Sequence, residues 1–197
     1  MVQQGKFILL SREEFKVWLL KLKCTRSIKL LQEHHTYLPD YQTFKEMKDY
    51  FRILEGMEKS HINRGFSEIA QSLTIFPDGL IAICRDFNKS PAGIRGANKT
   101  GICIENVGNF DAGKDKMSPE ERMSILDVTA LLCIHFKLKP GINTIVYHHW
   151  FDLSTGKRTN GGGETKSCPG TYWFGGNTIE ACQKNFIPGV INIMKTI

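Results

Sequence analysis

The chain has 197 residues, of which 41% are hydrophobic and 23% are charged, and its formal net charge is +6. This composition excludes a disordered chain and fits one globular domain, which we place at residues 1–197. The modest basic excess favours polyanionic partners. No run of five or more basic residues occurs, so we expect no nucleic-acid partner.

The cysteines and the N-terminus bear on the compartment. Four of the six cysteines lie in apolar stretches, where a free thiol packs as a small hydrophobic group. The apolar run FILL (7–10) is too short for the core of a signal peptide. No stretch approaches the roughly 18 apolar residues of a membrane span. We therefore expect reduced thiols and a monomer made in the cytoplasm without a signal peptide or membrane span.

The N-terminal quarter of the chain predicts a helix, a strand and a second helix. Ser11 and Glu14 form a capping-box pattern, in which each side chain bonds the other residue's backbone N–H. This pattern predicts a helix to about Leu22, within an N-terminal helical extension (1–25) packed on the domain. Residues 27–36 predict a strand, and residues 40–51 are a weaker helix candidate, with apolar side chains aligned on one face.

The middle of the chain predicts a hairpin and a buried strand. Residues 70–76 and 80–85 are strand candidates on either side of the turn sequence Pro77-Asp78-Gly79. Residues 100–107 are an apolar run that is typical of a buried central strand. The stretch 87–99 before this strand is a long loop, and long loops beside strand ends often carry function.

The C-terminal half returns to helices around one more strand. Ser118 and Glu121 repeat the capping-box pattern and predict a long helix to about residue 136. Residues 144–149 predict the last strand, and residues 152–174 a long loop. Asn177 with Glu180 opens a final helix, bent or interrupted near Pro188. The alternation predicts an α/β fold, a single domain with a central mixed sheet flanked by helices.

Two histidine pairs point to a metal site. His34-His35 and His148-His149 each end a predicted strand, and Cys168 follows in the second long loop. Because neighbouring side chains on a strand face opposite ways, at most one histidine of each pair faces a shared site. Two imidazoles and one thiolate would leave a tetrahedral zinc ion a fourth position for water, as in catalytic sites. By spacing alone, the histidine pairs could equally be ordinary surface or core residues.

Six stretches carry a resemblance to a known family: HHT (34–36), IFPDG (75–79), KSPAG (89–93), GICIENVGNFD (101–111), VYHHWFDLSTGKRTNG (146–161) and TKSCPGTYWFGGNT (165–178). They resemble the N-acetylmuramoyl-L-alanine amidase type 2 family, which includes peptidoglycan recognition proteins and T7-type lysozyme. The resemblance runs from about residue 11 to residue 195. It is closest to the amidases of Gram-positive bacteria and their phages.

The resemblance implies a site and a reaction. It implies that His34, His148 and Cys168 hold a Zn2+ ion at the floor of a surface groove. Lys166 matches the family's lysine, whose ammonium stabilises the oxyanion formed at the attacked carbonyl. The implied reaction is hydrolysis of the amide between N-acetylmuramic acid and L-alanine in peptidoglycan. We therefore expect peptidoglycan as the substrate and action on the cell wall after release from the cell.

Two departures from the family concern the proton-transferring group. Gln71 stands where many relatives have a tyrosine, and Cys103 where others have a catalytic glutamate. Glu105, two residues along the strand from Cys103, faces the same way, so we predict that it is the general base or orients the attacking water. Alternatively, it pairs with a basic neighbour. Gln71 can donate a hydrogen bond to substrate but cannot shuttle a proton; Arg95 and Asn98 are further candidate substrate contacts.

Other functional interpretations remain open at this stage. The chain could be a recognition module that binds peptidoglycan without cutting it. Relatives of that kind typically lose the cysteine ligand, whereas this chain keeps Cys168 and Lys166, which favours an enzyme. A structural zinc protein with a nucleic-acid-binding surface would need four protein ligands. His61, in a predicted polar loop, could line the substrate cleft.

Overall fold

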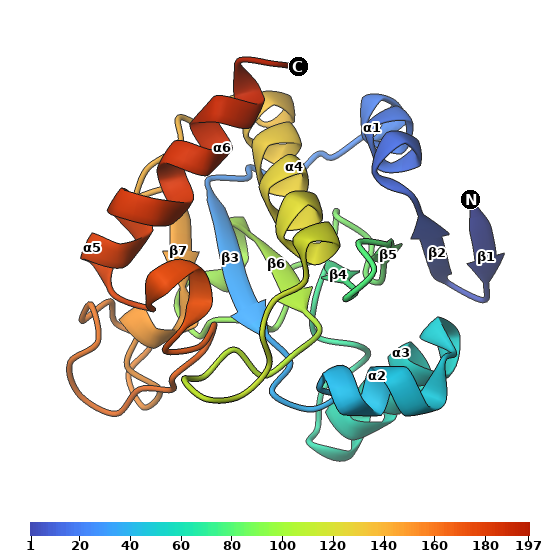
Figure 1. The fold of residues 1–197 in the computed structure, drawn as a ribbon, viewed down its shortest axis with the longest axis horizontal. Coiled ribbons are helices and arrows are strands. Elements are labelled where there is room, and N and C mark those ends of the chain that lie inside the picture. Colours follow the sequence, from blue (N-terminus) through green and yellow to red (C-terminus); the bar gives the residue numbers. More distant parts are fainter.

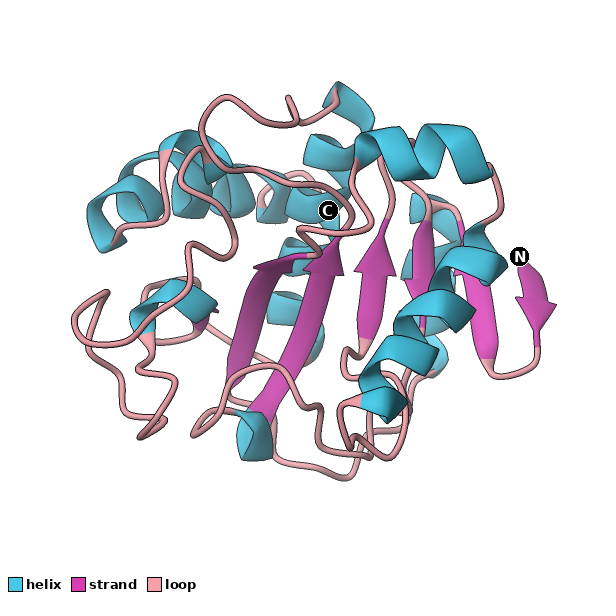
Figure 2. Cartoon of the chain, turned by 90° about the horizontal axis from the view of Figure 1, so that it is seen from below, coloured by secondary structure: helices cyan, strands magenta, loops and turns pink.

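Seven strands form one mixed sheet at the centre of the molecule. The computed structural model describes all residues, 1–197. The strand order is β1-β2-β5-β4-β6-β3-β7, and Figure 2 shows the strands side by side with the N-terminal hairpin at one edge. β6 is parallel to β4 and β3, and β3 to β7; the other pairs are antiparallel. The strands are β1 (Val2–Gln4), β2 (Phe7–Leu10), β3 (Leu30–His35), β4 (Leu73–Ile75), β5 (Ile81–Ile83), β6 (Gly101–Asn106) and β7 (Ile145–Tyr147).

Helices cover both faces of this sheet. The larger hydrophobic core lies between the sheet and α1, α4 and α6, and a smaller core lies between the opposite face and α3. Figure 1 shows α4 and α6 in front of the sheet and α2 and α3 beyond its lower edge. None of the helices is both long and apolar enough to cross a membrane. The helices are α1 (Arg12–Lys21), α2 (Tyr41–Met47), α3 (Tyr50–Asn63), α4 (Pro119–His135), α5 (Ile179–Ala181) and α6 (Ile187–Met194).

This architecture confirms the predicted α/β fold with a central mixed sheet. The N-terminus adds a feature that the sequence did not predict, because residues 2–10 form a hairpin whose second strand pairs with β5. Gly5 makes the turn with a φ of 57°, a left-handed conformation that glycine adopts without strain. Alternate residues of β2 then enter the two cores, Phe7 and Leu9 on one face and Leu10 on the other.

The helix predicted over residues 40–51 is two helices. Lys48 ends α2 in the left-handed region, with a φ of 50°. Asp49 then caps α3, its side chain accepting a hydrogen bond from the backbone N–H of Arg52 at 3.0 Å. α3 runs on to Asn63, so the prediction that His61 lies in a loop is wrong. The break matters because α3, and not a continuation of α2, supplies residues that line the main cleft of the molecule.

Capping is as predicted for α1 but not for α4. The reciprocal capping box at the start of α1 is present. At α4, Ser118 Oγ accepts from the backbone N–H of Glu121 at 3.0 Å, but Glu121 does not reach back. Instead the N–H of Ser118 donates to the Tyr41 hydroxyl at 2.8 Å, and this hydroxyl donates to the Glu121 carboxyl. The Tyr41 hydroxyl therefore lies between the two residues of the expected capping box and links α2 to α4.

The last helix begins one residue later than predicted. Thr178, not Asn177, caps α5, its side chain accepting from the N–H of Ala181. The Asn177 amide instead donates to the carbonyl of Ser167 at 2.7 Å. A π-helical segment (Cys182–Phe186) joins α5 to α6 just before Pro188, so the predicted interruption is present. Asn177 thus fastens the loop that carries Cys168 to the start of the last helix.

Candidate metal centre and cleft

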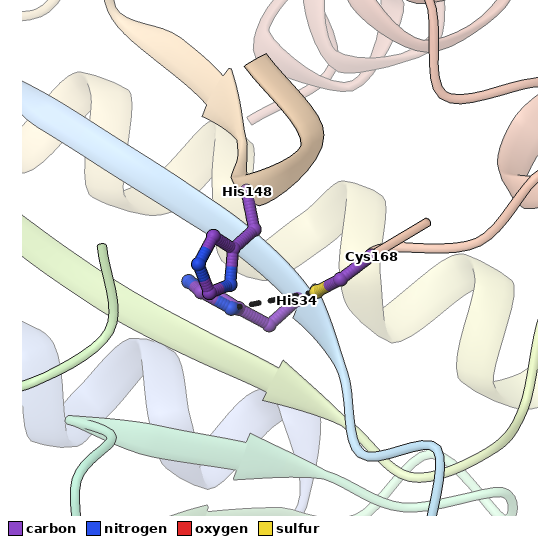
Figure 3. Close-up of side chains that lie close together, drawn as sticks. All are labelled: His34, His148 and Cys168. Atoms are coloured by element: carbon purple, nitrogen blue, oxygen red, sulfur yellow. Dashed lines mark hydrogen bonds between the residues drawn. The ribbon is translucent and has the colours of Figure 1, made fainter. Parts of the chain in front are cut away.

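Three donor side chains meet beyond the C-terminal ends of β3 and β7, as Figure 3 shows. Glu33 of β3 lies opposite Tyr147 of β7, so the next residues in each chain segment, His34 and His148, are neighbours. Their ring centroids are 4.8 Å apart. Cys168 approaches from the loop, with its Sγ 3.5 Å from Nδ1 of His34. One nitrogen or sulfur atom from each of these three side chains lies within 4.8 Å of the other two.

The loop around Cys168 is held by several polar contacts. The Cys168 carbonyl accepts from the N–H of His149 at 2.7 Å. The Ser167 hydroxyl donates to the Asp111 carboxylate at 2.9 Å, and the Asn177 amide holds the Ser167 carbonyl. Because these bonds fix the backbone on both sides of the thiol, the donor positions are set by the fold before any ligand binds.

The electrostatics of the three donors fit a bound cation. Burial, with smaller effects of His148 and Lys166, lowers the pKa of His34 well below its usual value. Burial lowers the pKa of His148 to about 4, so both imidazoles are neutral and offer lone pairs. Burial raises the pKa of the Cys168 thiol. A thiolate here therefore needs a compensating positive charge, which a divalent metal would supply.

The second histidine of each pair has a different role. His35 Nδ1 accepts a hydrogen bond from the backbone N–H of Phe110 at 3.1 Å. His149 Nδ1 lies 2.8 Å from the carbonyl oxygen of Lys166. Only one histidine from each pair thus belongs to the donor cluster. For His34 and His35 this follows from alternation along β3. The strand predicted over residues 144–149 ends at Tyr147, so His148 and His149 lie in a 3-10 turn (His148–Trp150) and not on a strand. His35 and His149 hold the backbone of the neighbouring loops.

Glu105 and Lys166 lie beside the donors. Glu105 of β6 is directly opposite His34 in the parallel register, and with His34 and Cys103 it forms a second group of close donor atoms. Burial raises the pKa of Glu105 to about 8, against smaller lowering effects of Lys166 and Arg64. Lys166 is exposed and lines the same cleft. The structure therefore brings both predicted catalytic residues to the donor cluster.

The donors open into a cleft of about 950 Å³. The loop after β3 and helix α3 form its far wall. Of this wall the sequence predicted only His61, which does line the cleft. Four wall residues are spaced four apart along α3, namely Arg52, Gly56, Ser60 and Arg64. Side chains four apart share one face of a helix. These four residues lie beside the buried Ile53 and Met57. Had the predicted helix been extended past residue 51, their spacing would have indicated a polar helix face.

The three predicted substrate contacts lie elsewhere. Gln71 is fully buried, and its amide donates to the Thr74 hydroxyl at 3.0 Å. Arg95 is exposed and bonds the carbonyl of Ser154. The Asn98 side chain accepts from the N–H of Ile94 at 2.9 Å. None of the three lines the cleft, so the structure does not support their prediction as substrate contacts.

A mixed sheet with a His-His-Cys donor cluster in a surface cleft defines an α/β protein with a candidate metal centre. A family model described as N-acetylmuramoyl-L-alanine amidase matches residues 25–171, a range that includes all three donors. The chain therefore belongs to the N-acetylmuramoyl-L-alanine amidase family. No curated protein matches it significantly.

Several solved structures share the fold. The amidase LysC from Clostridium intestinale URNW is 19% identical, with a TM-score of 0.54 over 81% of this chain and 85% of its own. Drosophila peptidoglycan recognition protein SA is 18% identical, with a TM-score of 0.60 over 83% and 82%. Drosophila PGRP-LB is 19% identical, with a TM-score of 0.58 over 83% and 84%. Identities this low show a common fold and no more.

Proposed function

We propose that the chain is a zinc-dependent amidase that hydrolyses the bond between N-acetylmuramic acid and L-alanine in peptidoglycan. The observation that carries the proposal is the cluster of His34, His148 and Cys168 in the cleft, within the family match. Two neutral imidazoles and one thiol suit zinc, which prefers nitrogen and sulfur ligands. Three protein ligands leave a position open to solvent and substrate, as a catalytic site requires. We further propose that the protein acts on the cell wall after release.

The chemistry divides between the metal and the chain. When bound, zinc would act as a Lewis acid on the scissile carbonyl and activate the attacking water. Lys166 would place its ammonium near the carbonyl oxygen and stabilise the negative charge that develops there. Removing one such preorganised donor commonly costs about 100- to 1000-fold in kcat.

Glu105 is the candidate for moving the proton. A general base is most effective when its pKa is near the working pH, and burial raises the pKa of Glu105 towards that range. Glu105 would take a proton from the attacking water and give it to the leaving amine. Gln71 cannot share this role, because its amide neither titrates nor reaches the cleft.

The alternative function is peptidoglycan binding without cleavage. Structures of peptidoglycan recognition proteins share the fold, and one of them is a complex of a PGRP-LB mutant with tracheal cytotoxin. A binding module would keep the cleft and have no need for a metal. The intact donor cluster and the nearby Glu105 and Lys166 favour an enzyme.

The test is hydrolysis of purified Gram-positive cell walls with metal content measured in parallel. We expect the wild type to carry about one zinc per chain, to release new L-alanine amino termini, and to lose activity with chelator. His148→Ala should lose both zinc and activity. His135→Ala, at the end of α4 and away from the cleft, is the matched control and should retain both. New reducing sugar ends, or activity that survives His148→Ala, would refute the proposal. Binding of walls without any cleavage would establish the alternative.

A further inference from the structure

The cleft is strongly cationic. Its lining includes three basic side chains, Arg52, Arg64 and Lys166, against a single carboxyl group, that of Glu105. Lys166 belongs to the proposed chemistry, but the two arginines on α3 do not. A cleft lined by one sign of charge attracts ligand groups of the opposite sign. A ligand with an anionic part would therefore be favoured along α3.

Arg64 is free to bind such an anion. Its guanidinium makes no ion pair and no hydrogen bond, and it lies 5.4 Å from the centroid of the Phe66 ring. Two arginines outside the cleft are engaged, since Arg85 pairs with Glu68 at 3.7 Å and Arg26 donates to several backbone carbonyls. A guanidinium that stacks on an aromatic ring still has its in-plane N–H groups free to donate to a carboxylate.

A neutral donor stands beside it. His61 lines the cleft one helical turn before Arg64, and its ring packs against Phe66 with centroids 5.7 Å apart. His61 Nδ1 accepts the backbone N–H of Ala70 at 3.1 Å, so the ring proton is on Nε2. Burial lowers the pKa of His61 to about 4, which keeps the ring neutral. His61 thus offers an N–H donor without adding a charge.

The position of Arg64 limits which anion it can reach. Arg64 and Glu105 line the same cleft, and the charge of Arg64 acts on the Glu105 carboxyl. Arg52 lies twelve residues earlier on α3, about 18 Å along the axis at the usual helical rise. Gly56 and Ser60, between the two arginines, are small and leave room for a peptide. An anion bound at Arg64 would therefore lie towards the Glu105 side of the cleft, and an anion bound at Arg52 farther along the wall.

We propose that Arg64, supported by His61 and Phe66, binds the free carboxylate carried by the stem residue that follows L-alanine. The chain would then prefer peptidoglycan in which this carboxyl is free over peptidoglycan in which it is amidated. This inference rests on the proposed function, because it takes the muramoyl peptide as the ligand of the cleft. It assigns a specificity-determining role to a residue that takes no part in the proposed bond cleavage.

The experiment compares two N-acetylmuramoyl peptides of equal length that differ only at the second stem residue, a carboxylate in one and a carboxamide in the other. We expect the wild type to prefer the carboxylate by about tenfold or more in kcat/KM, the effect of one charge-assisted hydrogen-bonding pair. Arg64→Gln should reduce this ratio to near one by impairing only the carboxylate peptide. Arg64→Lys should keep part of the preference, because it retains the charge and loses the planar fork. Lys59→Gln removes a charge from the same helix outside the cleft and should change nothing.

Binding of both peptides by calorimetry separates this inference from the proposed function. If the wild type binds the peptides and cleaves neither, the amidase proposal fails, and the ratio of Kd values still tests Arg64. A wild type that treats both peptides alike would overturn the inference. So would an Arg64→Gln variant that loses activity equally on both with a shifted pH profile, because Arg64 would then act on Glu105 and not on substrate.

Discussion

The polar side chains on the two faces of β3 differ in whether their hydrogen-bonding atoms have partners. On the face towards the cleft, Gln32 Nε2 and His34 Nε2 are buried and have no partner in the protein. On the face towards α4, Glu33 accepts hydrogen bonds from Thr129 at 3.0 Å and from Asn106 at 3.2 Å. These residues are neighbours in sequence and almost equally buried. Burial therefore does not distinguish them, whereas satisfaction of their hydrogen-bonding atoms does.

This difference separates residues that serve a site from residues that hold the fold. A buried polar atom without a partner costs stability, so each such atom needs an explanation, and a functional role is one of them. On the cleft side, His34 presents its Nδ1 to Cys168 Sγ in the donor cluster, while its Nε2 lies beside Gly93. On the α4 face the Glu33 carboxylate is paired, although its neighbours Asn106 and Tyr147 each keep one buried side-chain oxygen without a partner. The predictions that follow test this division, from the largest expected effect to the smallest.

Removing a thiol from each face gives the largest contrast. Cys168→Ala takes one of three metal donors, and we expect zinc affinity to fall by more than about 100-fold, since even outer-shell partners are worth 10- to 100-fold. Activity on cell walls should disappear with it. Cys133→Ala removes a fully buried thiol from α4 and should cost about 1–2 kcal/mol of stability with zinc content unchanged. Metal analysis and urea unfolding of both variants measure the contrast. Zinc loss in Cys133→Ala would break the division between the faces.

Gly93 tests the packing behind His34. A Cβ at this position would lie 2.5 Å from Gln32 Oε1, 2.6 Å from Cys103 Sγ and 3.0 Å from His34 Nε2. Gly93→Ala should therefore cost about 1–3 kcal/mol through overpacking and displace the His34 ring, lowering zinc affinity as well. Gly141→Ala, where the nearest atom is 4.0 Å away, is the control and should do neither. Full zinc affinity in Gly93→Ala would show that the loop does not position His34.

Strand periodicity accounts for what the sequence could predict. Alternation on β3 separates His34 from His35, and the parallel pairing of Glu33 with Tyr147 brings His148, the residue after β7, beside His34, so the donor cluster followed from local geometry and family resemblance. The α/β fold followed from the order of helix and strand signals. These features depend on residues close in sequence or on repeating patterns, which a single sequence carries.

The rest depended on contacts between distant segments. The Gln71 side chain turns inwards because the Thr74 hydroxyl and Met57 meet it there, and nothing in its own stretch indicates that direction. The cleft wall could be predicted only if α3 was recognised as a separate helix that continues past residue 51. The left-handed Lys48 and the Asp49 cap set the start of this helix. The N-terminal hairpin is short, and its sequence contains few local patterns that predict strands. Its pairing with β5 stabilises it.

Glu121 provides a test of whether a buried polar atom without a hydrogen-bond partner always indicates a functional role. Its Oε1 is buried without a partner, yet it lies outside the cleft. Burial raises its pKa above the ordinary 4.5, so the folded state binds its proton more tightly than the unfolded state. Stability should therefore fall as the pH rises above about 4.5. Glu121→Gln should remove this loss and add roughly 1–3 kcal/mol at pH 8 relative to wild type, with little difference at pH 4.

Urea unfolding at the two pH values measures the Glu121 effect. Glu120→Gln, an exposed change in the same helical turn, is the control and should cost only about 0.3–1 kcal/mol through the helix dipole. Zinc content and activity should be unchanged in both variants. A loss of activity in Glu121→Gln at unchanged stability would mean that this carboxyl serves the site through Tyr41 and α2.

Substitution of Thr129 should have the smallest effect on stability. It also tests most directly whether the two faces of β3 behave independently. Thr129→Val keeps the shape of the side chain and removes the hydroxyl that lies 3.0 Å from Glu33 and 2.7 Å from the Ile125 carbonyl. We expect a loss of about 1 kcal/mol in urea unfolding, against no measurable change for the exposed Thr196→Val. Glu33 is covalently next to His34, so a backbone shift on this face would reach the donor directly. Unchanged zinc affinity in Thr129→Val would show that the rigid sheet isolates the two faces, whereas a weaker zinc site would show that Thr129 helps to position His34 through the strand itself.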